Sequence, residues 1–128
     1  MRSSGGYLRV GALGTFEVPE GILAYVGSAY GPGGLIARIS RHFRKGKRLR
    51  WHVDYLTESG LVEVEGALAL PSVRERELLE VVMGFGEPLI PGFGCSDSRG
   101  DITHLFKLKD HIRLREFLID KYSAQELH

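Results

Sequence analysis

Three side chains suited to phosphate chemistry lie within one short stretch of the sequence, residues 25–42. Tyr25 precedes a glycine-rich segment, and Arg38 and His42 follow that segment four residues apart. A tyrosine and a histidine can activate and orient water by passing a proton between them, and an arginine can neutralise charge on a phosphate. The set therefore points to phosphodiester hydrolysis, provided that a carboxylate elsewhere holds a metal ion.

A strand, a turn and a helix are predicted to position these groups. The β-branched and aromatic run 22–26 is typical of a strand, and the glycines and proline within 28–34 end it. From Leu35 the apolar residues recur at spacings of three and four, which indicates an amphipathic helix. Arg38 and His42 then border the buried face of that helix.

The carboxylate is predicted in a second helix that opens near Ser72 and runs to about Met83. At about 100° per residue, Glu75 falls on the apolar face, whereas Glu77 and Glu80 point away. A carboxylate on an apolar face needs a partner, because an unpaired buried charge is costly. That partner is a metal ion, an arginine, or the helix N-terminus if Glu75 completes a capping box with Ser72.

A basic run adjoins this chemistry. The net charge is only +1, but seven of the 17 Lys and Arg residues lie at positions 38–50, with no acid among them. Such a run suits a phosphate backbone, because each neutralised phosphate releases counterions. A solvated helix end and loop is the alternative interpretation. The candidates for nucleic-acid binding are Arg41, Arg44, Lys45, Lys47, Arg48 and Arg50.

Length and composition predict one soluble domain. The 128 residues, 43% of them apolar, fit a single core, and Cys95 is the only cysteine, so that neither an intrachain disulfide nor a cysteine-based zinc site can form within this sequence. No apolar run is long enough to span a bilayer, and the first residues lack the apolar stretch of a secretory signal. We expect a cytoplasmic protein without membrane association.

The rest of the chain alternates short strands with glycine turns before a closing helix. We predict strands at 7–10, 15–18, 60–70 and 103–108, a turn at 19–21, a loop at 84–94, and a helix at 110–122. The segment 50–56 fits either a strand or a helix start, and its Trp, Val and Tyr residues favour an extended or mixed conformation. Within it, His52 and Asp54 are candidates for supporting residues beside the site.

The order of these motifs resembles the GIY-YIG nuclease superfamily. Gly5-Gly6-Tyr7 and Tyr25-Val26-Gly27 are followed by Arg38, His42 and a later helical glutamate. The segments Y-V-G-S-A, W-H-V-D-Y-L and F-G-C-S-D are similar, more specifically, to a family of uncharacterised small domains placed within that superfamily. The similarity extends over about residues 5–108.

The resemblance implies an α/β (α+β) fold with a small three-stranded antiparallel sheet flanked by helices. Residues 1–108 would form the nuclease-like domain, in which an inserted hairpin lengthens the interval between the two tyrosine motifs. Residues 109–128 would add a helical extension to the same domain.

The resemblance also implies metal-dependent DNA cleavage and a role for each matching residue. Tyr7 would act as general base or orient the attacking water, and Tyr25 would hold the water or the phosphate. Arg38 would stabilise charge on the phosphate, and His42 would accept a proton from a tyrosine. Glu75 would ligate Mg²⁺ or Mn²⁺.

Two functions follow from these observations. The first is a DNA endonuclease, with repair as its setting, that depends on a protein partner or a second subunit to choose its substrate. The second is a nucleic-acid-binding module that has kept the fold and lost the chemistry, because the chain contains no asparagine where many superfamily members place one. If the chemistry is kept, Ser96, Asp97 or His104 would supply this phosphate contact in place of the asparagine.

Overall fold

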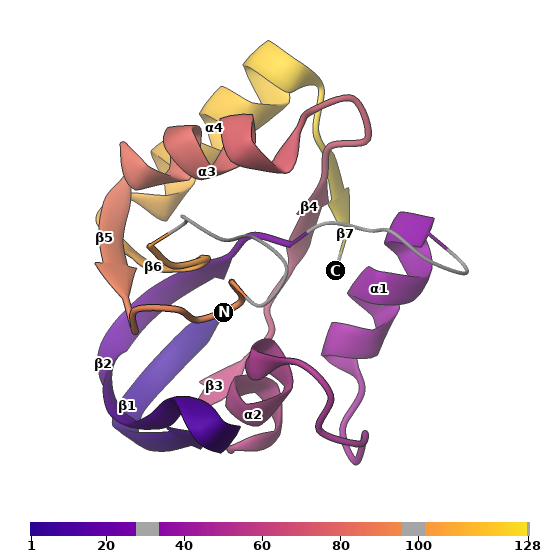
Figure 1. Ribbon diagram of the computed structural model, residues 1–128. Helices are drawn as coiled ribbons and strands as arrows, with labels where there is room; N and C mark the ends of the chain where they lie inside the picture. The colour runs from indigo at the N-terminus through magenta and orange to yellow at the C-terminus, as the bar shows by residue number, and fades with distance from the viewer. Residues whose placement is uncertain (28–33, 96–101, 128) are drawn as a thin grey trace.

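The computed structural model describes residues 1–27, 34–95 and 102–127, and for residues 34–38 the backbone alone. Within these ranges the chain forms an α+β fold with a five-stranded antiparallel sheet, a two-stranded sheet and four helices (Figure 1). The large sheet has the strand order β3-β1-β2-β6-β5. The predicted fold class is confirmed, but the large sheet has five strands where three were predicted.

A long hairpin of β1 (Arg2–Val10) and β2 (Gly14–Tyr25), joined by a short 3-10 turn, forms the centre of the sheet. The predicted turn at 19–21 is wrong, because β2 continues through Pro19. Pro19 lies opposite Gly5, between two regular cross-strand pairs. Gly5 has φ +83°, and its N–H donates to the Ser3 hydroxyl at 3.1 Å instead of to the ladder. The strand therefore accommodates a residue that lacks an N–H.

The other strands lie on both sides of this hairpin. β6 (Leu105–Leu108) pairs with β2 and with β5 (Gly86–Leu89), so the predicted loop at 84–94 is wrong over these four residues. β5 is an edge strand, where its proline is tolerated. The predicted strand at 60–70 is two strands, β3 (Val62–Glu63) on the opposite edge and β4 (Ala67–Ala69), which pairs with β7 (Gln125–Leu127).

Four helices complete the described part of the chain: α1 (Gly34–Phe43), α2 (His52–Glu58), α3 (Glu75–Met83) and α4 (His111–Tyr122). The predictions of α1, α4 and the end of α3 are confirmed. Ser72 does not cap α3, because the helix begins three residues later, after Arg74. In the described ranges no helix is both long enough and apolar enough to cross a membrane.

The extended conformation favoured for 50–56 is wrong, because α2 occupies most of that segment. The carboxylate of Asp54 accepts the backbone N–H groups of Arg50 and Trp51, each at 2.8 Å. These bonds satisfy donors at the start of the helix. They outweigh the strand preference of the aromatic and β-branched residues in the segment.

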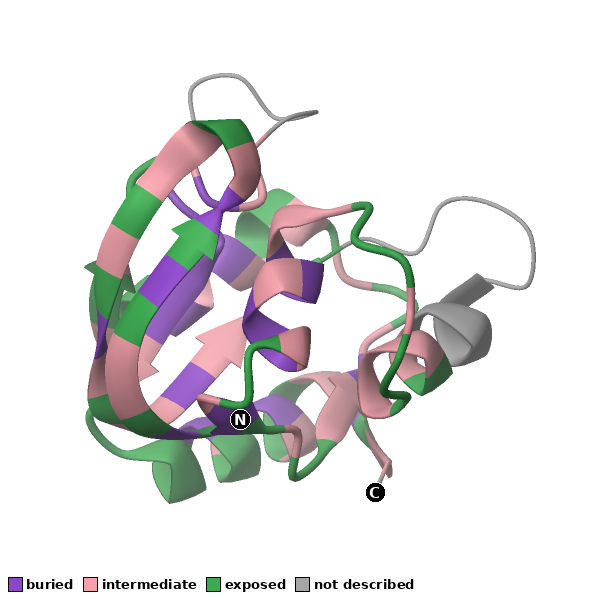
Figure 2. Ribbon diagram, turned by 90° about the horizontal axis from the view of Figure 1, so that it is seen from below, coloured by how far each residue is buried: buried purple, intermediate pink, exposed green. Residues whose placement is uncertain are grey.

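Helices cover both faces of the sheet, and neighbouring residues of a strand point into different cores. Leu23 and Leu105 pack with α2 in one cluster, whereas Phe106 and Val26 pack with α3 and α4 in the other. Figure 2 shows the buried residues along the strands and on the inward sides of helices. The predicted extension at 109–128 thus contributes α4 to the second core. This alternation also decides which way the last residues of β2 face.

Candidate active site

The end of β2 meets α1 through two aromatic rings. Tyr25 is the last residue of β2, and its ring lies edge-on to that of His42, with centroids 6.0 Å apart and planes at 73°. His42 lies in the last turn of α1. The structure therefore brings together the tyrosine and the histidine that the sequence singled out. The side chain of Arg38 lies outside the described part of the chain.

Glu75 faces the protein interior from the first turn of α3 and contacts His104. Its Oε1 lies 3.3 Å from Nδ1 of His104, and the Glu75 side chain is 22% exposed. The same Nδ1 lies 3.0 Å from the carbonyl oxygen of Val26. Both neighbours are acceptors, so Nδ1 carries the proton and donates to them. Glu77 and Glu80 are exposed, as the helical projection predicted.

Gly94 lies against one member of each of these two pairs and was not recognised from the sequence. It has φ +72°, and a Cβ added to it would lie 3.0 Å from His104 Cβ and from Tyr25 Cε1. Its N–H donates to Nδ1 of His52 at 2.8 Å. Only a glycine therefore lets this backbone lie so close to both the tyrosine and the buried histidine. The signal in the sequence was a glycine directly after a large aromatic residue, which is too common to be specific.

Phe93 fills the space beneath this group. It is fully buried, and its ring lies 6.0 Å from that of Tyr25 and 5.7 Å from that of His52. These edge-on and tilted contacts are favourable for aromatic rings. Phe93 therefore fixes the direction of the Tyr25 ring, while His52 holds the backbone of Gly94.

Asp54 is a buried anchor between α1 and α2. One carboxylate oxygen accepts from Arg41, and the other accepts the two backbone N–H groups at the start of α2. Burial opposes ionisation of this carboxyl group, but the hydrogen bonds from Arg41 and from the backbone outweigh burial, and the pKa of Asp54 is lowered. Asp54 thus fixes α1, which carries His42, against α2, which carries His52.

Tyr7 lies apart from this group. It stands opposite Glu17 in the hairpin, eight positions before Tyr25 on β2, which at about 3.3 Å per residue is roughly 26 Å of strand. Its side chain is 76% exposed. The structure therefore does not bring the two motif tyrosines together.

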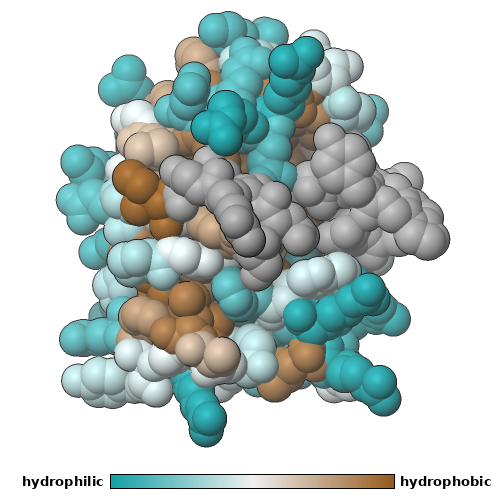
Figure 3. Space-filling model, viewed as in Figure 1, coloured by the Kyte–Doolittle hydropathy of each residue, from teal (hydrophilic) through white to brown (hydrophobic). Residues whose placement is uncertain are grey.

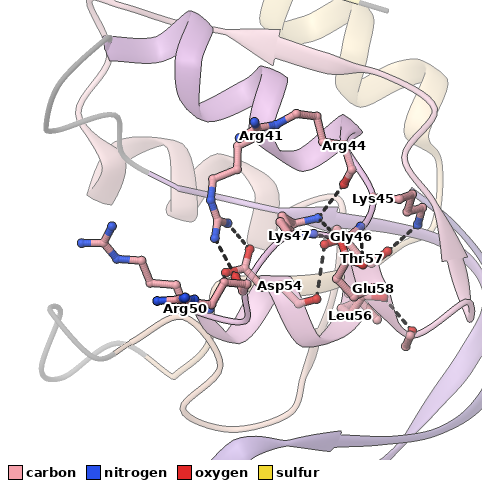
Figure 4. Close-up of polar contacts among 12 residues, drawn as sticks. Arg41, Arg44, Lys45, Gly46, Lys47, Arg50, Asp54, Leu56, Thr57 and Glu58 are labelled. Atoms are coloured by element: carbon pink, nitrogen blue, oxygen red, sulfur yellow. Dashed lines mark hydrogen bonds and ion pairs between the residues drawn. The ribbon is translucent and has the colours of Figure 1, made fainter.

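The basic run covers the second half of α1 and the segment that leads to α2, and it is partly engaged in internal contacts. Arg41 binds Asp54, Lys45 binds the carbonyl oxygen of Thr57, and Lys47 binds Glu58 at 2.8 Å (Figure 4). The hydrogen bond from Lys47, followed by those from backbone N–H groups, lowers the pKa of Glu58 to about 2. The guanidinium groups of Arg44, Arg48 and Arg50 form no ion pair with any residue in the described ranges.

Comparison with known proteins decides the family. A family model described as "Domain of unknown function DUF123" matches residues 2–127. The chain belongs to the DUF123 family. No curated protein and no solved structure matches it. The DUF123 match includes α4 and β7, so the segment predicted as an extension lies within the family's domain.

Glu75 is the residue that the sequence analysis singled out as a ligand for a metal ion. Within residues 1–27, 34–95 and 102–127, no three His, Cys, Asp or Glu side chains gather closely enough to hold an ion by themselves. Mg²⁺ commonly binds through one or two carboxylates, with waters and substrate phosphate completing its shell. Glu75 is partly exposed, and one of its oxygens contacts His104. The residues present therefore fit an ion that binds together with the substrate.

Proposed function

We propose that this DUF123 domain is a metal-dependent DNA endonuclease that hydrolyses phosphodiester bonds. One observation carries the proposal: the Tyr25–His42 pair and the Glu75–His104 pair meet the chain at two successive residues at the end of β2. Tyr25 contacts His42, and the carbonyl of the next residue accepts from His104, which also contacts Glu75. The resemblance to the GIY-YIG superfamily supports the same set of residues.

The side chains would divide the chemistry among them. The Tyr25 hydroxyl would orient the attacking water or a phosphate oxygen. His42 would accept the proton of the Tyr25 hydroxyl, because a tyrosine with a pKa near 10 is a poor base alone. Glu75 would hold Mg²⁺ or Mn²⁺, and the ion would supply positive charge at the phosphate. His104 would orient the Glu75 carboxylate through its Nδ1–H. The resemblance assigns further charge neutralisation to Arg38.

Cleavage of a panel of labelled DNAs tests the proposal. Duplex, single-stranded, flap and branched substrates are incubated with Mg²⁺ or Mn²⁺, for the native chain and for Glu75→Gln. The matched control is Glu80→Gln, because Glu80 is exposed on the same helix. We expect cleavage in the native chain and the control, and its loss in Glu75→Gln. Equal cleavage by Glu75→Gln and the native chain would overturn the proposal.

Two observations favour a second candidate, a nucleic-acid-binding module without catalysis. The exposed Tyr7 lies far along the sheet from Tyr25, and the described residues contain no ready-made metal cluster. This candidate predicts salt-sensitive DNA binding and no cleavage with any divalent ion. A protein partner or a second copy that selects the DNA substrate stays a prediction under either candidate.

A further inference from the structure

We infer that the basic run is divided by its contacts into an internal scaffold and a DNA-backbone-binding surface formed by Arg44, Arg48 and Arg50. The inference deepens the proposed function and rests on DNA as the partner. It also narrows the six candidates that the sequence offered, because three of them bind acceptor groups of the protein itself.

The scaffold consists of Arg41, Lys45 and Lys47. Arg41 binds Asp54 and Lys47 binds Glu58, and these two acids lie four residues apart, on one side of α2. Glu58 also accepts the backbone N–H of Gly46 at 3.0 Å. Breaking the Asp54 pair would leave a buried carboxylate without its cation, which is strongly unfavourable. Arg41 is therefore not available to a ligand, and Lys45 and Lys47 already bind the Thr57 carbonyl and the Glu58 carboxylate.

The scaffold also holds the backbone of each exposed arginine. Lys47 Nζ donates to the carbonyl oxygen of Arg44, and Arg41 Nη2 donates to that of Arg48, both at 2.9 Å. The backbone N–H of Arg50 donates to Asp54. The backbones of all three arginines are thus fixed, while their guanidinium groups stay exposed. A surface whose backbone is already fixed loses less conformational freedom on binding than a surface on a flexible segment.

Two of the exposed groups, those of Arg44 and Arg48, border a basic hollow, and Arg50 is not part of its lining. The hollow has a volume of about 360 Å³ and is lined by Arg41, Arg44, Lys45, Gly46, Lys47 and Arg48, without an acidic side chain. Hydrophilic side chains project in this region of the space-filling view, below α1 (Figure 3). Arginine forks match phosphate oxygens in pairs, and contacts to phosphates do not depend on the base sequence.

The surface continues directly from the candidate active site. Arg44 follows His42 by two residues, at the end of α1. Arg50 lies with its guanidinium carbon 5.1 Å from the centre of the Trp51 ring, a cation–π distance that places it at the start of α2. A DNA strand bound along these arginines would therefore lead toward Tyr25 and His42.

The salt dependence of duplex binding tests the inference. Fluorescence anisotropy with a labelled duplex, in chelator so that no cleavage occurs, gives the dissociation constant at a series of salt concentrations. We expect Arg44→Gln, Arg48→Gln and Arg50→Gln each to reduce the slope of log affinity against log salt by about 1. Lys47→Gln should keep the native slope and lower thermal stability. Arg113→Gln, an exposed residue of α4, is the control.

The outcomes separate this surface from the proposed endonuclease. The proposed surface would be ruled out if the salt slope is unchanged in all three arginine variants. It would also be ruled out if Lys47→Gln reduces the slope as much as the arginine variants do. Full cleavage of duplex by the triple arginine variant at physiological salt would also overturn it, and would leave the endonuclease intact. Expected slopes without cleavage under any metal would overturn the endonuclease and support the surface.

Discussion

The backbone N–H of Gly94 donates a hydrogen bond of 2.8 Å to Nδ1 of His52, 42 positions earlier in the chain. This bond joins the start of α2 to the backbone that lies against Tyr25 and His104. It also shows that Nδ1 of His52 carries no proton. His52 is therefore a positioning residue, which acts on the site through the backbone of Gly94.

Replacing His52 tests this role. We expect His52→Ala to lower the free energy of unfolding by about 1 kcal/mol, because one hydrogen bond is lost, and to speed amide hydrogen exchange at Gly94. His52→Asn should restore most of the protection, because the asparagine oxygen can replace Nδ1 as acceptor. Equal exchange in native chain and His52→Ala would contradict the role.

The close approach at Gly94 predicts a larger effect for Gly94→Ala than for Gly60→Ala. Both glycines have positive φ, +72° and +81°, but a Cβ at Gly60 meets nothing within 4 Å. We expect each variant to lose about 1 kcal/mol of stability from backbone strain. Gly94→Ala should lose more and should also impair cleavage, since Tyr25 and His104 must move apart. Urea denaturation and the cleavage assay measure the two effects, and matching values for the two variants would argue against the packing.

The positions of the two motif tyrosines predict opposite results for their phenylalanine variants. Tyr25→Phe keeps the ring contact with His42 and removes the hydroxyl, so we expect cleavage to slow by at least about 100-fold. Tyr7→Phe should leave the rate unchanged, because Tyr7 is exposed far along the hairpin. Single-turnover cleavage rates give the comparison. A severe loss in Tyr7→Phe alone would reverse the assignment.

Acid should weaken the junction between the basic run and α2. The pKa values of Asp54 and Glu58 are lowered in the folded protein, that of Glu58 to about 2, so their stabilising contribution is present above the unfolded values near 4. It is lost as the pH falls toward 2. The urea concentration at the unfolding midpoint should decrease as the pH is lowered from 6 to 2. The decrease should be less steep in Glu58→Gln than in the native chain. The exposed-residue variant Glu80→Gln serves as control, and a native-like pH profile in Glu58→Gln would contradict the account.

Local patterns predicted the parts of the fold that local interactions decide. The spacing of apolar residues gave α1, the end of α3 and the inward direction of Glu75. The continuity of β2 through Pro19 could not be predicted, because it depends on Gly5 in the neighbouring strand. The role of Gly94 also depends on distant partners. Residue types could indicate the candidate chemistry. They could not show that Tyr7 lies far along the sheet from Tyr25, because that depends on the pairing of β1 with β2.

The last residue of β2 and the residue that follows it pack into different cores of the protein. Tyr25 packs with the α2 side of the sheet, and Val26 is buried on the side of α3 and α4. A slip of β2 by a single residue would exchange these two side chains between the faces. It would place a tyrosine in the α3–α4 core and remove it from His42. A misregistered hairpin would therefore lose stability and the candidate site together. The register that buries Val26 is the same register that places Tyr25 beside His42.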